Sequence, residues 1–247
     1  MSRRAGSAAL RFDGFIAGLG TTSGTRLVLG HWPRSPFGPF SDVMLERPDG
    51  HRLLLAPTPE TARFISGTYR FDEVRVVPVQ VRVRGDDWTV VAGDVLRLRF
   101  TVGRRGLTGL ALRAVPGSLA AWPPWTAVTD LPARLLLGVR TRGSAGGGRR
   151  EWYGARDLHR VTAVSATHEG RDLGSPALVV PPVRFGFGST PRRPALVRVT
   201  TTVGPERAGS GMSGRARRGV SSDHGSEDPA PAGAGDGPGS GEHGRDR

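Results

Sequence analysis

The chain has 247 residues, contains no Cys, Lys or Asn, and carries 35 Arg against 22 acidic residues, for a formal charge of +13 at pH 7. This composition excludes disulfides, thiolate metal sites, cysteine nucleophiles, Walker loops and Schiff-base or general-base chemistry on lysine. The length predicts one main domain, and the charge favours anionic partners or ligands. The missing amino acids have AT-rich codons, so a GC-rich genome by itself explains the use of Arg in place of Lys.

The first elements are a predicted strand over residues 10–17 and a glycine-rich loop over 18–24. The loop nearly matches a dinucleotide-binding fingerprint. Residues 25–29, however, have the composition of a strand, whereas a phosphate cradle needs the N-terminus of a helix at that point. We therefore expect a hairpin turn here.

A turn-rich stretch follows, in which two prolines within residues 35–39 form a rigid corner. Proline lacks an N–H group and holds the residue before it in an extended conformation, so this corner is neither helix nor central strand. One interpretation makes it the wall of a site carrying His31, Trp32 and Asp42. The interpretation that we favour is a structural corner packed on aromatic rings.

A hairpin and a helix are predicted next. Residues 42–56 form a hairpin around Pro48-Asp49-Gly50, since proline presets φ and glycine supplies a positive φ. Thr58-Pro59-Glu60 reads as a helix start, with a hydroxyl cap, proline in the first turn and an acid beside it. Gly67 is the expected end of that helix.

Residues 73–115 have the alternation of an antiparallel meander with one polar face, and the predicted strands are 73–84, 88–92, 95–102 and 107–115. The alternation changes phase at Pro78, which indicates a bulge or an edge strand. The polar face carries four arginines whose like charges need solvent, nearby acids or an anionic ligand. These are Arg82, Arg84, Arg97 and Arg99.

The second half of the chain is less regular. Residues 122–125 are predicted to be extended, 131–139 could be strand or short helix, and 143–148 form a loop. Further strands are expected at 151–167, 176–187 and 195–203. The predicted fold is mainly β: an antiparallel barrel-like or sandwich body over residues 1–203 with one short helix. Residues 204–247 are predicted to be a disordered tail rich in Gly, Pro, Ser and acidic residues.

The basic charge is assigned to the body, because the tail from residue 204 holds six Arg and seven acidic residues. No segment approaches the ~20 apolar residues that span a bilayer, and the N-terminus lacks the apolar stretch of a secretion signal. We expect a cytoplasmic protein without membrane association. His168, Glu169 and Asp172 lie around a turn without a third ligand at a suitable spacing, so neither a metal nor a cofactor is predicted.

The segment over residues 148–159 is the most suggestive of a site, because it combines charged, aromatic and imidazole side chains. Alternation along a strand places Glu151 and Tyr153 on one side and Arg150 and Trp152 on the other. We expect Glu151 and Tyr153 to line a pocket. Burial there would raise the pKa of Glu151 unless an arginine pairs with it.

Two short motifs carry a resemblance to a known family. The run Arg150-Glu151-Trp152-Tyr153-Gly154 and the corner at residues 36–40 resemble motifs of the acetoacetate decarboxylase-like family. The resemblance implies a β-barrel-like body with a central pocket. It does not imply decarboxylation, because Ala155, Arg156 or Asp157 stands where that family has its catalytic lysine, and a guanidinium cannot form the Schiff base. The chain as a whole is also similar to β-rich actinobacterial proteins, which implies nothing about activity.

Three functions are compatible with these observations, and the oligomeric state stays open. The first is a non-catalytic protein that binds an anionic small molecule through an arginine-rich β face or pocket. The second is an enzyme in a decarboxylase-like pocket without Schiff-base chemistry, in which Glu151, Tyr153 and His159 do acid–base work. The third is weak binding of nucleic acid by the basic body. The candidate ligand-binding residues are Arg150, Glu151, Tyr153, His159, Arg82, Arg84, Arg97 and Arg99. No residue is assigned as catalytic.

Overall fold

The structure is a computed structural model that describes residues 9–114, 142–145, 149–186 and 190–205. Predictions for 122–125, 131–139 and the tail beyond 205 concern residues outside these ranges. The elements are β1 (Leu10–Thr21), β2 (Arg26–Arg34), β3 (Phe40–Glu46), β4 (Arg52–Ala56), α1 (Pro59–Ser66), β5 (Glu73–Val76), β6 (Val79–Arg84), β7 (Asp87–Ala92), β8 (Leu96–Arg105), α2 (Leu107–Ala114), β9 (Arg142–Ala145), β10 (Arg149–His168), β11 (Arg171–Asp172), β12 (Pro176–Ala177) and β13 (Ala195–Pro205).

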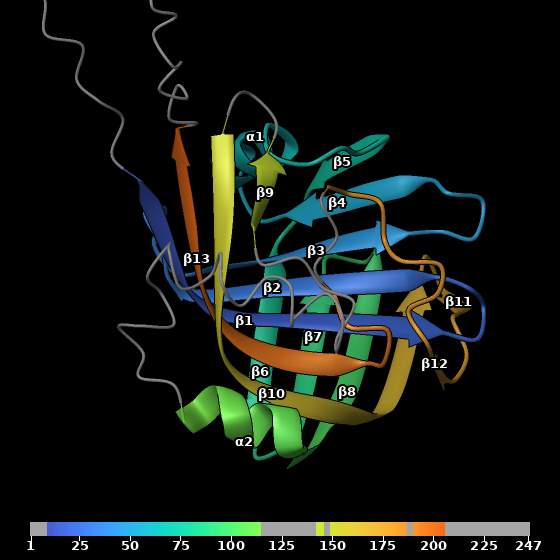
Figure 1. The fold of residues 1–247 in the computed structure, drawn as a ribbon. Helices are drawn as coiled ribbons and strands as arrows, with labels where there is room; N and C mark the ends of the chain where they lie inside the picture. Colours follow the sequence, from blue (N-terminus) through green and yellow to red (C-terminus); the bar gives the residue numbers. More distant parts are fainter. Residues whose placement is uncertain (1–8, 115–141, 146–148, 187–189, 206–247) are drawn as a thin grey trace, which may run out of the picture. The chain divides into compact units, whose positions relative to one another are not determined.

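One sheet dominates the fold, with the strand order β5-β4-β3-β2-β1-β13-β10-β8-β7-β6 (Figure 1). The short strands β9, β11 and β12 pair with β10 or β1 beside this path. Every pair is antiparallel except β4 with β5, which run parallel. The mainly β fold is thus confirmed, with one parallel pair where the sequence predicted only antiparallel strands.

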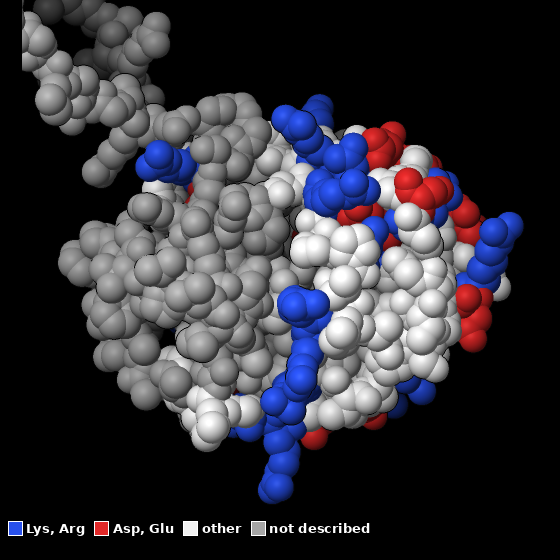
Figure 2. Space-filling model, turned by 45° about the vertical axis from the view of Figure 1, so that its right-hand side comes forward, with Lys and Arg blue, Asp and Glu red and all other residues white. Residues whose placement is uncertain are grey.

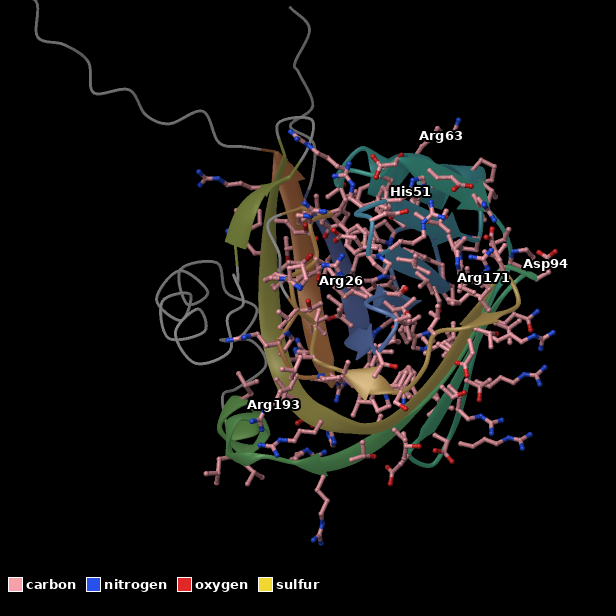
Figure 3. All side chains as sticks on the ribbon, turned by 90° about the vertical axis from the view of Figure 1, so that its right-hand side faces the viewer. Arg26, His51, Arg63, Asp94, Arg171 and Arg193 are labelled. Atoms are coloured by element: carbon pink, nitrogen blue, oxygen red, sulfur yellow. The ribbon has the colours of Figure 1, made fainter. Side chains whose placement is uncertain are left out.

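The sheet is curled because its two edge strands follow each other in the chain. β5 and β6 lie at opposite ends of the strand order, yet only Val77 and Pro78 separate them in sequence. The Val77 N–H donates to the Ala56 carbonyl at 2.9 Å, and the Pro78 carbonyl accepts from the Gly93 N–H at 3.0 Å. The path therefore bends into a half-barrel around its side chains (Figure 3). The edge-strand reading of the phase change at Pro78 is confirmed.

Strands β1 to β4 bury both of their faces except at the start of β1 and the end of β2. One face carries a leucine-rich core cluster with residues such as Leu19, Leu27 and Leu45, all at 0% exposure. The opposite face, with Val28 and Met44, packs under α1 and under a strap of residues 178–186. Because both faces are covered, these strands have near-continuous apolar runs rather than alternation. This second buried face is where the candidate site lies.

The hairpin and helix predicted in the first half are confirmed. β3 and β4 pair in antiparallel register around the turn at Gly50, whose φ is +89°. α1 begins after Thr58, whose hydroxyl accepts from the Thr61 N–H at 3.1 Å in a capping box, and Gly67 caps its end. The hairpin turn expected over residues 18–24 also forms, but it is shorter than predicted, because residues 18–21 continue β1 and pair with β2.

Three further sequence expectations are wrong. The strand predicted over 107–115 is a second helix, α2, because its Leu and Ala residues form helix as readily as strand. Residues 143–145 belong to β9 rather than to a loop. The strand predicted over 176–187 shortens to β12, since Pro181 and Pro182 have no N–H groups for a sheet ladder. Within the described ranges, neither helix is long and apolar enough to cross a membrane.

Candidate functional site

A cavity of about 70 Å³ lies between the second buried face of β1 to β3, the inner side of α1 and the strap. The first part of β10 and the last part of β13 complete its wall. Most of the wall is apolar, with the aromatic rings of Phe12, Phe40 and Phe64 among the lining side chains. A space of this size holds roughly five water molecules, or a ligand with about that many heavy atoms.

A carboxyl group and two phenols meet on one wall of the cavity. Glu151, only 3% exposed, accepts from the Tyr69 hydroxyl, which lies 2.8 and 2.7 Å from its two carboxylate oxygens. The Tyr69 and Tyr153 hydroxyls are 2.5 Å apart. Burial raises the pKa of Glu151 to about 7, although hydrogen bonds from both tyrosines lower it. Burial, and then the nearby Glu151 charge, hold the pKa of Tyr69 well above its usual value.

A second buried carboxyl group lies on β3. Asp42 is 2% exposed, and its Oδ1 accepts from the Trp32 indole N–H at 3.1 Å. Gly30 faces Asp42 across the β2–β3 ladder. A Cβ atom there would lie 2.5 Å from Oδ1 and 2.6 Å from the indole nitrogen, so glycine leaves room for the pair. Burial raises the pKa of Asp42 to about 7, partly offset by the indole.

Thr201 also lines the cavity, and its hydroxyl has no hydrogen-bond partner among the described residues. The residue is 2% exposed, and its Oγ1 is buried without a hydrogen bond. It lies on β13 directly opposite Tyr153 of β10, so it belongs to the same wall as Glu151. A buried hydroxyl without a partner costs about 1–3 kcal/mol, and such a group is satisfied when a water or ligand binds beside it.

The charge of the cavity is set by its two carboxyl groups, because its described lining includes no arginine. An anion placed there would lie beside Asp42 and Glu151 without a counter-charge. Burying an unpaired charge is costly, and a neighbouring like charge adds to the cost. The cavity therefore favours uncharged ligands.

Of the residues singled out from the sequence, the structure brings Glu151 and Tyr153 into the cavity, on the same side of β10 as expected. Arg150, on the alternate side, is exposed. His159 lies beyond a bulge in β10 at Arg156, and outside the cavity. Its ring contacts the Gly103 carbonyl at 3.1 Å and an Asp157 oxygen at 3.3 Å. The ligand-binding roles of these residues stay predictions.

The four arginines of the meander lie away from the cavity, on the outer side of β6 and β8; we call them the arginine face. All are exposed, and Thr89 of β7 stands between Arg82 and Arg99 in the ladder. Figure 3 shows side chains projecting from the outer side of these strands. In the view of Figure 2, basic and acidic side chains are intermixed over the upper part of the molecule. The members of the arginine face are Arg82, Arg84, Arg97 and Arg99.

The favoured interpretation of the corner over residues 35–39 is confirmed, because the Phe37 ring packs on those of Phe40 and Phe64, with centroids 6.3 and 4.9 Å apart. The alternative, the wall of a functional site, stays a prediction. Trp32 and Asp42 do line the cavity, whereas His31 points elsewhere, bonding Ser41 at 2.8 Å and packing on the Trp88 ring. Tyr69 and Thr201 were missed. Tyr69 follows a helix end and Thr201 lies in a run of three threonines, so neither has a local pattern that indicates a site.

Two solved structures of acetoacetate decarboxylases align with the chain. One solved structure, acetoacetate decarboxylase from Legionella pneumophila subsp. pneumophila str. Philadelphia 1, aligns with a TM-score of 0.38 and 11% identity, covering 80% of this chain and 85% of that one. A second acetoacetate decarboxylase structure aligns with a TM-score of 0.37 and 7% identity, covering 81% and 88%. No family model and no curated protein matches the chain. At these values the likeness carries nothing about substrate or reaction.

Proposed function

We propose that the cavity binds a small, uncharged, largely apolar molecule that carries a carbonyl or hydroxyl oxygen. The observation that carries this proposal is the buried Thr201 hydroxyl, which has no hydrogen-bond partner among the described residues and belongs to a side chain of the cavity wall. A ligand oxygen beside it would accept a hydrogen bond from that hydroxyl. Such an oxygen would also lie near the strand position of Tyr153, opposite Thr201 in the sheet. The aromatic wall would bury the apolar part of the ligand.

A matched pair of probes tests this proposal. Butanone and propanoate have nearly the same shape, but propanoate is an anion at neutral pH. We expect saturation-transfer NMR to detect butanone bound to the native protein and to give no signal for propanoate. Equal binding of the two probes, or binding of propanoate alone, would contradict the proposed uncharged ligand.

Thr201→Val removes the hydroxyl while keeping the shape of the side chain. We expect it to weaken butanone binding about fivefold, the value of one ordinary hydrogen bond of roughly 1 kcal/mol. The free energy of unfolding should stay unchanged or rise, because a buried group without a partner is removed. Thr202→Val is the control, since Thr202 lies next to it on the alternate side of β13. Unchanged binding by Thr201→Val would refute the assigned contact.

A second proposal concerns the arginine face, which could bind an anionic small molecule. It is supported by four exposed arginines on the same side of β6 and β8, the two strands that flank β7, and none of the four has an ion pair to the described residues. Two of them, Arg82 and Arg99, flank a single threonine and could hold one anion together. Like charges gathered in this way attract anions from solution.

Tripolyphosphate is the probe for the arginine face, measured by calorimetry at low and at physiological salt. We expect binding that weakens as salt rises and that falls at least tenfold in the double variant Arg82→Gln/Arg99→Gln. Arg11→Gln, an exposed arginine on β1, is the control and should leave binding unchanged. A double variant that binds as tightly as the native protein would rule out this surface. Binding of an oligonucleotide but not of tripolyphosphate would instead favour nucleic acid.

A further inference from the structure

We infer that the cavity catalyses enolisation: Asp42 takes a proton from the carbon next to a ligand carbonyl while Glu151 gives one to the carbonyl oxygen. This inference rests on the proposed binding of a small uncharged carbonyl compound. It is carried by the placement of two buried carboxyl groups, from strands far apart in the sheet, on the wall of one small cavity.

The carbonyl oxygen of the ligand would bind at the wall of the cavity that β10 and β13 form. Glu151 is joined to the Tyr69 hydroxyl at 2.7 and 2.8 Å, and the Tyr153 hydroxyl lies 2.5 Å from that of Tyr69. The Thr201 side chain, on the strand beside Tyr153, also lines the cavity, and its buried hydroxyl has no hydrogen-bond partner within the described part of the chain. Donors gathered at one end of an apolar space can stabilise negative charge that develops on a ligand oxygen.

Asp42 lies where the carbon next to the ligand carbonyl would bind. Its Oδ1 is held by the Trp32 indole at 3.1 Å, which fixes the plane of the carboxylate. Trp32 is itself buried and packs edge-on against Phe12, with ring centroids 5.7 Å apart. Gly30 leaves the space in which the carboxylate and the indole meet. Asp42 is thus a positioned carboxylate in an apolar setting, where a carboxylate is a stronger base than in water.

The step is balanced without a co-reactant. The C–H bond next to the carbonyl breaks and its proton goes to the Asp42 carboxylate. The electron pair of that bond forms the C=C bond, and the C=O π electrons move to oxygen, which takes the Glu151 proton. Reversal returns the ketone, with a proton from solvent in place of the original one. The step needs Asp42 ionised and Glu151 protonated, and with both pKa values near 7 a singly protonated pair is well populated at neutral pH.

The test follows the exchange of butanone C–H for C–D in deuterium oxide by proton NMR. We expect the native protein to accelerate the loss of the signals next to the carbonyl. Asp42→Asn and Glu151→Gln should each slow it at least tenfold, since general acids and bases contribute about 10²–10⁴-fold. Asp49→Asn is the matched control, because Asp49 is an exposed carboxyl in the β3–β4 turn, and its exchange rate should equal that of the native protein.

Both variants keep the shape of the side chain, and butanone binding by saturation transfer shows whether the cavity is intact. Binding without exchange by the native protein overturns the enolisation step and leaves the proposed function standing. Exchange that persists in both single variants also overturns it. A native protein that neither binds butanone nor exchanges it overturns the proposed function and this inference together.

Discussion

Replacing Glu46 by glutamine is expected to lower the free energy of unfolding by about 3–5 kcal/mol, the usual result of removing one partner of a buried ion pair. Glu46 is fully buried at the end of β3, and Arg26 beside it is 2% exposed. The Arg26 Nη2 atom lies 3.3 Å from Glu46 Oε1. Without the carboxylate, the Arg26 charge stays buried against two backbone carbonyls alone, those of Pro181 and Arg47.

Glu46 also holds the strap in place through two hydrogen bonds from Arg184. Weakening them adds to the expected decrease in the free energy of unfolding. The Arg184 backbone N–H donates to Oε2 at 2.7 Å, and its Nε donates to Oε1 at 2.9 Å. Arg184→Ala should cost less than Glu46→Gln, because the Arg184 side chain is largely exposed and its backbone contact remains.

Urea denaturation of the full chain measures the Glu46 prediction, and Arg11→Ala is its control. Arg11 pairs with Asp13 on the surface, with the Arg11 side chain 55% exposed. Surface pairs contribute about 0–1 kcal/mol, so the control should lose no more than that. A Glu46→Gln protein as stable as Arg11→Ala would mean that the buried pair adds no net stability.

The parts of the fold that could be predicted from sequence are those set by neighbouring residues. Alternation of apolar and polar residues predicted β8, and the turn residues around Gly50 predicted the β3–β4 hairpin. Thr58 predicted the start of α1. α2 was missed because leucine and alanine runs do not discriminate between helix and strand. The parallel pairing of β4 with β5 was missed because it depends on the curl of the whole sheet.

Only the site residues whose side of a strand follows from simple alternation could be predicted from the sequence. Glu151 and Tyr153 lie two residues apart on β10, and that spacing alone placed them together. Tyr69 reaches Glu151 from 82 residues earlier in the chain, and Asp42 comes from a strand four positions away in the sheet. Turn chemistry favoured a purely structural role for the corner near Asp42. The Asp42 carboxyl belongs to a cavity because both faces of β3 are buried, and no local sequence pattern indicates that burial.

The free energy of unfolding is expected to depend on pH through Asp42 and Glu151. The pKa values of Asp42 and Glu151 are both about 7 in the folded chain, against ordinary values of 3.8 and 4.5. Between those limits the folded state holds protons that the unfolded state releases, so these groups make the protein less stable as pH rises from about 4 to 7. At about 1.4 kcal/mol per pKa unit, the loss is roughly 4 kcal/mol for Asp42 and roughly 3 kcal/mol for Glu151, and it is complete above pH 7.

The double variant Asp42→Asn/Glu151→Gln removes this loss. Relative to the native protein, its free energy of unfolding should rise by several kcal/mol between pH 5 and pH 8. His31 and His168 have lowered pKa values from burial, and they make the protein more stable as pH rises through their range. Both histidines are present in the native protein and in the variant, so their contribution cancels in the difference. Urea denaturation at a series of pH values gives this difference directly.

The single variants then show whether the two carboxyl groups titrate as a pair. If they interact across the cavity, removing one charge lets the other ionise at lower pH, and the two single effects add to more than the double effect. Independent groups would give additive effects, which fits two separate carboxyls better than an acid–base pair. If the difference in free energy of unfolding between the double variant and the native protein does not change with pH, both groups titrate in the folded chain as they do in the unfolded one. Their burial on the cavity wall would then have no energetic consequence, and the cavity would have to be open to water.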